Sequence, residues 1–309
     1  MGKYLLKVFY FTIPVLAVLL FIVVIDPYEL VNISHLISAQ SKIAVLNRSD
    51  EASPRGNMLW KTIHFKREPK SKLIIGDSQG RKIKESIIKE VSGEDYFNYC
   101  CEGASYETMI DVFWFAARQV KLEKVVFQVG YANYSANRSY NLFHFGIDIT
   151  DEPYTYFTTP DILVDSYENL LFAITKNRSL VENSYEYQDP ADLDSLSEFR
   201  LGLFFGDYEY PAKFYAELKK ISDYCKDNNI QLSFLILPVY DRVTEYLKDN
   251  GLEVVSLRFK EDMHRLGKTY DFELPSEMTG TRANFIDYFH PKQPILDKIT
   301  REVWGKQNE

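Results

Sequence analysis

The amino-acid sequence predicts an α/β fold in which a parallel sheet is covered by helices on both faces. One observation is a regular alternation: five short apolar runs, each the length of a strand, alternate with stretches whose apolar residues recur at helical spacing. A second observation is that most of these runs are continuously apolar, as in strands that are buried on both faces. Strand–helix alternation of this kind is typical of a parallel sheet between two helical layers.

Each element has its own stretch of sequence that predicts it. The strands are expected at 73–75, 95–100, 124–130, 230–238 and 269–274. The helices are expected at about 81–91, 106–120, 211–228, 253–266 and 293–304, where apolar residues return every three or four positions. In parallel sheets the functional site lies at the carboxyl ends of the strands, so chemistry is expected in the loops that follow them.

Residues 134–210 interrupt this rhythm. The segment is rich in Tyr, Phe, Asn and Asp, and it holds one clear helical stretch at 160–177. We interpret it as an insertion after the third strand. An insertion at that point can form a wall or lid of the substrate site, because it starts at the edge of the sheet where the site lies. The alternative is a packing elaboration that does not contact substrate.

The N-terminus predicts a membrane anchor. Residues 1–7 carry Lys3 and Lys7, and residues 8–25 carry no charge. An uncharged run of this length can span a bilayer core, and the positive flank is expected to stay in the cytoplasm. The expected topology is therefore single-pass, with the remainder of the chain on the extracytoplasmic side. The alternative is a cleaved signal peptide, although "DPYELVN" offers no small-residue cleavage site after the run.

The sequence predicts a simple organisation after this anchor. Residues 26–70 are expected to form a juxtamembrane linker, since "NRSDEASPRGN" has the polar and turn-forming composition of an exposed loop. Residues 71–309 are expected to form the folded domain, with the insertion inside it. At 46% hydrophobic residues, the chain can bury one sizeable core.

Composition excludes some classes of function. A net charge of -8 over 309 residues argues against a nucleic-acid partner. The cysteines Cys100, Cys101 and Cys225 lack metal-ligand spacing, and neither a metal nor a cofactor is expected. We expect buried free thiols, with a bridge from Cys225 to one of the other two as the alternative.

Three residue types required for acyl transfer occur in suitable places. Ser78 follows the first strand, at a turn into a helix, where free backbone N–H groups favour negative charge. His290 stands near the C-terminus, three residues after Asp287. A serine hydroxyl needs a base to become a nucleophile, and the base needs an acceptor that fixes its tautomer. Ser78, His290 and Asp287 are therefore the predicted nucleophile, base and orienting carboxylate.

An oxyanion hole is expected beside them. The backbone N–H groups of Ser78 and Gly103 and the side-chain amide of Asn133 follow the first, second and third strands, and parallel strands bring these loops to one edge. Taken singly, each residue also has an ordinary structural role. Ser78 suits a helix N-cap, His290 a surface or capping position, Asp287 the cap of the last helix, Asn133 a turn and Gly103 the entry to a helix.

Taken together, these blocks resemble the SGNH (GDSL) hydrolase superfamily. "IIGDSQG" is similar to its first block, with Ser78 as nucleophile; Gly103 matches the second-block glycine; Asn133 in "GYAN" matches the third-block asparagine; and "DYFH" matches the closing Asp-x-x-His. The resemblance implies a flavodoxin-like three-layer α/β/α sandwich and a Ser-His-Asp triad.

The resemblance covers about residues 72–304, with the insertion unmatched. The chain departs from the family pattern at Gln79, where the family name has leucine, and at Tyr134, where an aspartate often follows the asparagine. The N-terminal run, together with "DPYEL", "YDFEL" and "NFIDYFHP", resembles the membrane-anchored branch of the family. That branch includes the D-alanyl transfer protein of teichoic acid modification and proteins of alginate O-acetylation.

The branch implies an envelope function. The expected protein is a membrane-anchored O-acyltransferase or acylesterase that acts on a cell-envelope polysaccharide, beside a multispanning membrane acyltransferase as partner. Two alternatives remain open: a lipase or thioesterase, and a non-catalytic binding or assembly subunit that keeps the fold.

Overall fold

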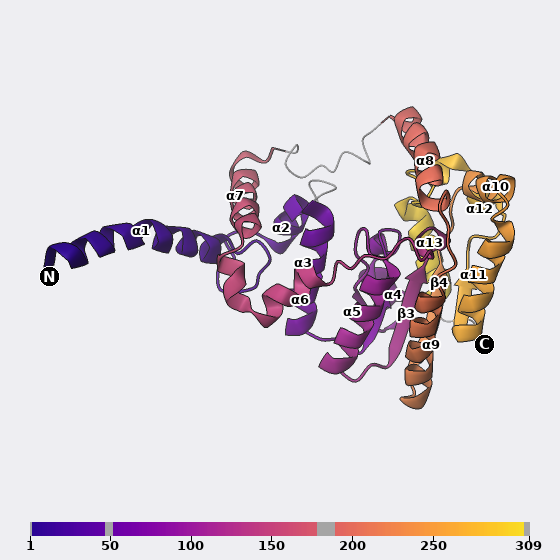
Figure 1. Cartoon of the computed structure of the whole chain (residues 1–309), viewed down its shortest axis with the longest axis horizontal. Helices are drawn as coiled ribbons and strands as arrows, with labels where there is room; N and C mark the ends of the chain where they lie inside the picture. The colour runs from indigo at the N-terminus through magenta and orange to yellow at the C-terminus, as the bar shows by residue number, and fades with distance from the viewer. Residues whose placement is uncertain (1, 47–51, 178–188, 306–309) are drawn as a thin grey trace. The chain divides into compact units, whose positions relative to one another are not determined.

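The computed structural model describes residues 2–46, 52–177 and 189–305. The chain folds into two compact units (Figure 1). The first unit contains the described residues of 1–67 and 144–184, and the second contains those of 68–143 and 185–309.

The second unit is built on a five-stranded sheet. The strands are β1 (Lys72–Ile75), β2 (Phe97–Asn98), β3 (Lys124–Val129), β4 (Gln231–Ile236) and β5 (Lys268–Asp271). All neighbouring strands are parallel, and their order is β2-β1-β3-β4-β5. This is the strand order of flavodoxin-like doubly wound sheets. The predicted α/β class and parallel sheet are confirmed, and each strand lies within one or two residues of, or inside, its predicted range.

Helices pack on both faces of this sheet because the strands bury side chains on both faces. The helices of this unit are α4 (Glu85–Ser92), α5 (Tyr106–Gln119), α8 (Pro190–Phe205), α9 (Ala212–Asp227), α10 (Asp241–Asp249), α11 (Glu253–Leu266), α12 (Glu277–Gly280) and α13 (Gln293–Trp304). Val126 and Leu235 lie in a core cluster with residues of α4 and α13. Their neighbours Phe127 and Phe234 pack against each other with tilted rings on the other face, where the ring of Phe113 in α5 contacts Phe127.

Two parts of this unit differ from the sequence prediction. The helix expected from residue 81 is divided into a 3-10 turn, η1 (Gly80–Lys82), and α4. The Asn98 amide donates to the carbonyl oxygens of Gly80 (3.0 Å) and Ile83 (2.9 Å), which holds the chain in an extended step between the two helices. The second difference is that α8, α10 and α12 are missing from the sequence prediction, although Val243, Tyr246 and Leu247 of α10 recur at helical spacing.

The first unit consists of helices. They are α1 (Gly2–Ile25), α2 (Ala39–Leu46), α3 (Ala52–Arg67), α6 (His144–Asp151), the 3-10 helix η3 (Pro153–Phe157) and α7 (Pro160–Thr175). The predicted linker thus contains α2 and α3. Of the loop predicted at 47–57, residues 47–51 lie outside the described residues and the rest begins α3. Its polar first turn resembles a loop, while Leu59 and Ile63 farther along are buried.

The predicted insertion is also divided between the units. Residues 134–143 and the described residues after 188 belong with the sheet, whereas α6, η3 and α7 belong with α2 and α3. Sequence reasoning missed this because the first unit is assembled from two segments that are far apart along the chain.

The predicted anchor falls within α1. Among the residues that the structure describes, no helix is long and apolar enough to cross a membrane, and the anchor stays a prediction. The cysteine prediction is clearer: Cys100, Cys101 and Cys225 are all buried free thiols, so the alternative of a bridge from Cys225 is wrong.

Candidate active site

The site lies at the carboxyl edge of the sheet, as the topology predicts. A pocket of about 210 Å³ opens there. It is lined by residues that follow β1, β3, β4 and β5, by Gly103 after β2, and by side chains from α8 and α10. Four of the five predicted site residues line the pocket: Ser78, Gly103, Asn133 and His290. The fifth, Asp287, lies behind His290.

Ser78, His290 and Asp287 form one chain of hydrogen bonds. Ser78 Oγ lies 2.9 Å from His290 Nε2. His290 Nδ1 lies 2.8 and 2.9 Å from the two oxygens of Asp287. A carboxylate can only accept, so Nδ1 carries the hydrogen and Nε2 is left to accept from the serine hydroxyl. The structure therefore brings the three predicted residues together in the geometry that a serine nucleophile requires.

Neither Ser78 nor Asp287 has the helix-capping role that its position in the sequence would also suit. The N-cap positions of η1 and α4 are Gln79 and Lys84, so Ser78 caps neither helix. The N-cap position of α13 is Lys292, so Asp287 does not cap the last helix. Both side chains are engaged with His290 instead.

Asp287 is held rigidly in a buried position. Its side chain is 2% exposed. It accepts from the backbone N–H of Phe289 (2.9 Å) and of His290 (2.8 Å). Nη1 of Arg200, on α8, also donates to it at 3.2 Å. Buried carboxylates need such partners, and these donors orient the carboxylate toward the imidazole.

The electrostatics suit a general base. Burial alone would lower the pKa of His290, but the charge and hydrogen bond of the adjacent Asp287 carboxylate, together with the charge of Asp77, raise the pKa above its usual value of 6.5. Burial alone would raise the pKa of Asp287, but the charge and hydrogen bond of His290 and the N–H of Phe289 lower it below its usual range. Asp287 therefore stays ionised wherever His290 titrates.

A pair of glutamines ties the nucleophile turn to the histidine loop. Gln128 Oε1, in β3, accepts from the backbone N–H of Asp77 (2.9 Å) and of Gly80 (3.2 Å). Its Nε2 donates to Gln79 Oε1 at 3.1 Å, and Gln79 Nε2 donates to the carbonyl of Phe289 at 2.6 Å. Sequence reasoning missed Gln128, although a buried amide inside the apolar run "VVFQV" was a signal for it.

The predicted oxyanion donors surround the same pocket. Ser78, Gly103 and Asn133 all line it. Within the described part of the chain, the backbone N–H groups of Ser78 and Gly103 make no hydrogen bond. Gly103 has φ +68°, a left-handed conformation that favours glycine. Asn133 Nδ2 donates to Asp77 Oδ2 at 2.7 Å, which occupies one of its two hydrogens and leaves the other for the pocket.

The segment predicted as an insertion contributes to the pocket. Arg138, Tyr140, Phe204 and Phe205 all line it. The Arg138 guanidinium stacks on the Phe204 ring at 4.3 Å. The interpretation that this segment forms a wall of the site agrees with these contacts, although residues 144–177 belong to the other unit.

Comparisons with known proteins add little. No family model and no curated protein matches the chain. Among solved structures, one from Streptococcus pneumonia, described as that of a proposed platelet activating factor, is similar at 12% identity and a TM-score of 0.39, covering 82% of this chain and 94% of that one. At these values the similarity carries no argument, and the function has to be inferred from the site.

Proposed function

We propose that this protein is a serine-dependent O-acyltransferase or acylesterase that acts on a cell-envelope polysaccharide. The observation that carries the chemistry is the continuous hydrogen-bonded chain from Ser78 through His290 to Asp287 at the edge of a pocket. The resemblance of the four sequence blocks to SGNH hydrolases supports the same chemistry. The choice of an envelope glycan is supported by the resemblance of the N-terminal run, "DPYEL", "YDFEL" and "NFIDYFHP" to the membrane-anchored branch.

The first half-reaction transfers an acyl group to the enzyme. Ser78 Oγ attacks the carbonyl carbon of the acyl ester while His290 Nε2 takes the hydroxyl proton. The oxygen that becomes negative is stabilised by the N–H groups of Ser78 and Gly103 and by the Asn133 amide. When the intermediate collapses, the bond to the alcohol breaks, and His290 returns the proton to that leaving group.

The second half-reaction releases the acyl group. A hydroxyl of the glycan, or water, attacks the carbonyl carbon of the acyl-serine while His290 Nε2 takes its proton. When this intermediate collapses, the bond to Ser78 Oγ breaks and His290 returns the proton to Ser78. Attack by the glycan gives transfer and attack by water gives hydrolysis, and the same residues serve both. The resemblance also implies a multispanning membrane acyltransferase as the partner beside which the protein works.

A fluorophosphonate probe tests the nucleophile on the full chain. Ser78 is expected to displace fluoride and form a phosphonate ester, and mass spectrometry of the labelled peptide should locate the adduct on Ser78. Ser195→Ala is the matched control, because this serine of α8 is exposed and its hydroxyl donates to the carbonyl of Ala191 at 3.0 Å, away from His290. It should keep full labelling, and Ser78→Ala should lose it. Wild-type protein that stays unlabelled would favour the binding or assembly subunit instead.

One observation favours a second candidate, a lipase or thioesterase. Phe204, Val243 and Leu247 give one side of the pocket an apolar lining that suits a longer acyl chain. This alternative shares the triad and differs in the length of the acyl group, in the acceptor, which is water, and in the leaving group, which is a thiol for a thioesterase. A preference for long-chain esters, with no acylation of glycan, would support it.

We also propose that the protein is retained at the cell membrane. The support is the uncharged stretch of residues 8–25, which the structure places within helix α1. Protein purified from the membrane fraction of intact cells is expected to keep its first 25 residues, as measured by its intact mass. A mature protein that begins after Ile25 would show that the segment is a cleaved signal instead.

A further inference from the structure

Helix α7 of the first unit buries polar side chains and exposes apolar ones. A surface helix normally buries its apolar side chains and exposes its polar ones. The face of α7 that is buried carries Asp165, Ser166 and Asn169 beside a single apolar residue, Ile162. The outward side carries a run of apolar residues and one tyrosine at helical spacing, bordered by Glu168 and Thr175: Leu163, Val164, Tyr167, Leu170, Leu171 and Ile174. We call this set the apolar stripe of α7.

The buried polar face is built into the unit. Asp165 Oδ2 accepts from the Tyr28 hydroxyl at 2.7 Å and from Nη1 of Arg55 at 2.9 Å. Asn169 Nδ2 donates back to the Asp165 carbonyl at 2.8 Å. These bonds fix the rotation of the helix, because turning it would leave a buried carboxylate and guanidinium without partners. The apolar stripe is therefore held outward.

The stripe is large and strongly exposed. Tyr167 is 58% exposed and Ile174 is 72% exposed, and Leu163 and Val164 are exposed beside them. Ile33 and Leu36, which lie between α1 and α2 in the same unit, are 74% and 68% exposed. Scattered apolar side chains on a surface need no explanation, but a contiguous set marks a surface that is covered by something else.

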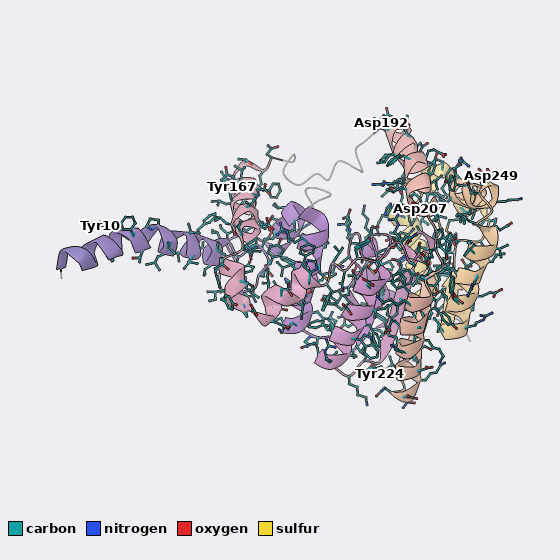
Figure 2. All side chains as sticks on the ribbon, viewed as in Figure 1. Tyr10, Tyr167, Asp192, Asp207, Tyr224 and Asp249 are labelled. Carbon is teal, nitrogen blue, oxygen red and sulfur yellow. The ribbon has the colours of Figure 1, made fainter. Side chains whose placement is uncertain are left out.

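The neighbouring helix indicates what covers it. Residues 9–18 of α1 are exposed on every side of the helix, and nearly all are apolar. A helix that is apolar on all sides needs apolar surroundings on all sides. The hydrocarbon of a membrane provides them, whereas the face of one partner protein would cover only one side of the helix. α7 packs directly against α1, and Ile22 of α1 shares a buried cluster with Ile162 of α7. Both helices are seen in Figure 2, with Tyr10 and Tyr167 labelled.

We propose that the apolar stripe of α7 rests in the surface of a lipid membrane, as a second contact beside α1. A helix can lie in the interface with its apolar face in the acyl-chain boundary without crossing the bilayer. The proposal rests on the membrane location proposed above but not on the acyl-transfer chemistry. The fixed rotation of α7 would then orient the first unit on the membrane.

The test measures contact with lipid at single positions of the full chain. Tyr167→Cys and Ile174→Cys are labelled with an environment-sensitive fluorophore, which is selective because the native cysteines are buried. Each protein is reconstituted into phosphatidylethanolamine–phosphatidylglycerol vesicles that contain nitroxide-labelled lipid. Tyr154→Cys is the matched control: Tyr154 is a tyrosine of the same unit, 66% exposed, and its hydroxyl donates to Glu152 at 2.6 Å.

The expected result is loss of most of the fluorescence at positions 167 and 174, with little loss at position 154. Equal quenching at all three positions, or none at positions 167 and 174, would overturn the proposal. Disulfide-linked pairs through position 167 without quenching would show that the stripe joins two copies of the chain. Protein that does not float with vesicles would reject the membrane location as well, while fluorophosphonate labelling of Ser78 would be unaffected.

Discussion

Ser78→Ala is expected to lower turnover of an aryl acetate by a factor on the order of 10⁵ to 10⁶, and His290→Ala by a similar factor. The hydroxyl and the imidazole act as one unit through their 2.9 Å contact, since neither a serine without a base nor a base without a nucleophile can acylate. The double variant should therefore be hardly slower than either single variant. The measurement is kcat/KM for aryl acetate, together with acyl transfer to the isolated glycan.

The controls separate loss of chemistry from loss of fold. Ser78 and His290 are only half-buried, so both variants should keep a melting temperature within a few degrees of the wild type. Ser195→Ala should keep wild-type rates in both assays. If the two single losses multiply in the double variant, Ser78 and His290 do not act together, and the triad assignment fails. If Ser78→Ala keeps its activity, the nucleophile is another residue.

The parts of the site that could be predicted are those set by short stretches of sequence. β3 is a run of apolar residues, and Asp287 lies three residues before His290, so each could be recognised locally. Ser78 and His290 are 212 positions apart, yet their meeting was predictable because a parallel sheet brings the loops after its strands to one edge. The topology supplied the long-range contact that periodicity alone cannot give.

The parts that could not be predicted depend on tertiary packing. Arg200 lies between Phe199 and Leu201 in α8, and nothing near it in the sequence points to a carboxylate 87 positions away. α7 was predicted as a helix, but its buried face could not be predicted, because the rule that apolar residues face inward gives the opposite answer. Its rotation follows from the bonds of Asp165 to Tyr28 and Arg55, which join separate segments.

Asp287→Asn is expected to lower kcat by about 10² to 10⁴-fold and to move the acid limb of the pH–rate profile to lower pH. The rate falls because the asparagine NH₂ can donate to Nδ1, which moves the imidazole hydrogen to Nε2. A protonated Nε2 cannot accept the hydroxyl proton of Ser78. The limb moves because activity needs neutral His290 and is lost as pH falls through its pKa. In the wild type that pKa is raised above 6.5, and Asp287 is the largest influence that raises it. Without this carboxylate, burial prevails and the pKa falls.

Arg200→Gln supplies a control of opposite sign. The Arg200 charge lowers the pKa of His290, so its removal should move the acid limb to higher pH, while Asp287 keeps the correct tautomer and most of the rate. Profiles of kcat/KM against pH for the three proteins would show both directions in one experiment. If the acid limb moves in the same direction in both variants, it reports the pKa of a group other than His290. A purely structural disturbance of the loop has no reason to shift the limb one way when a negative charge is removed and the other way when a positive charge is removed.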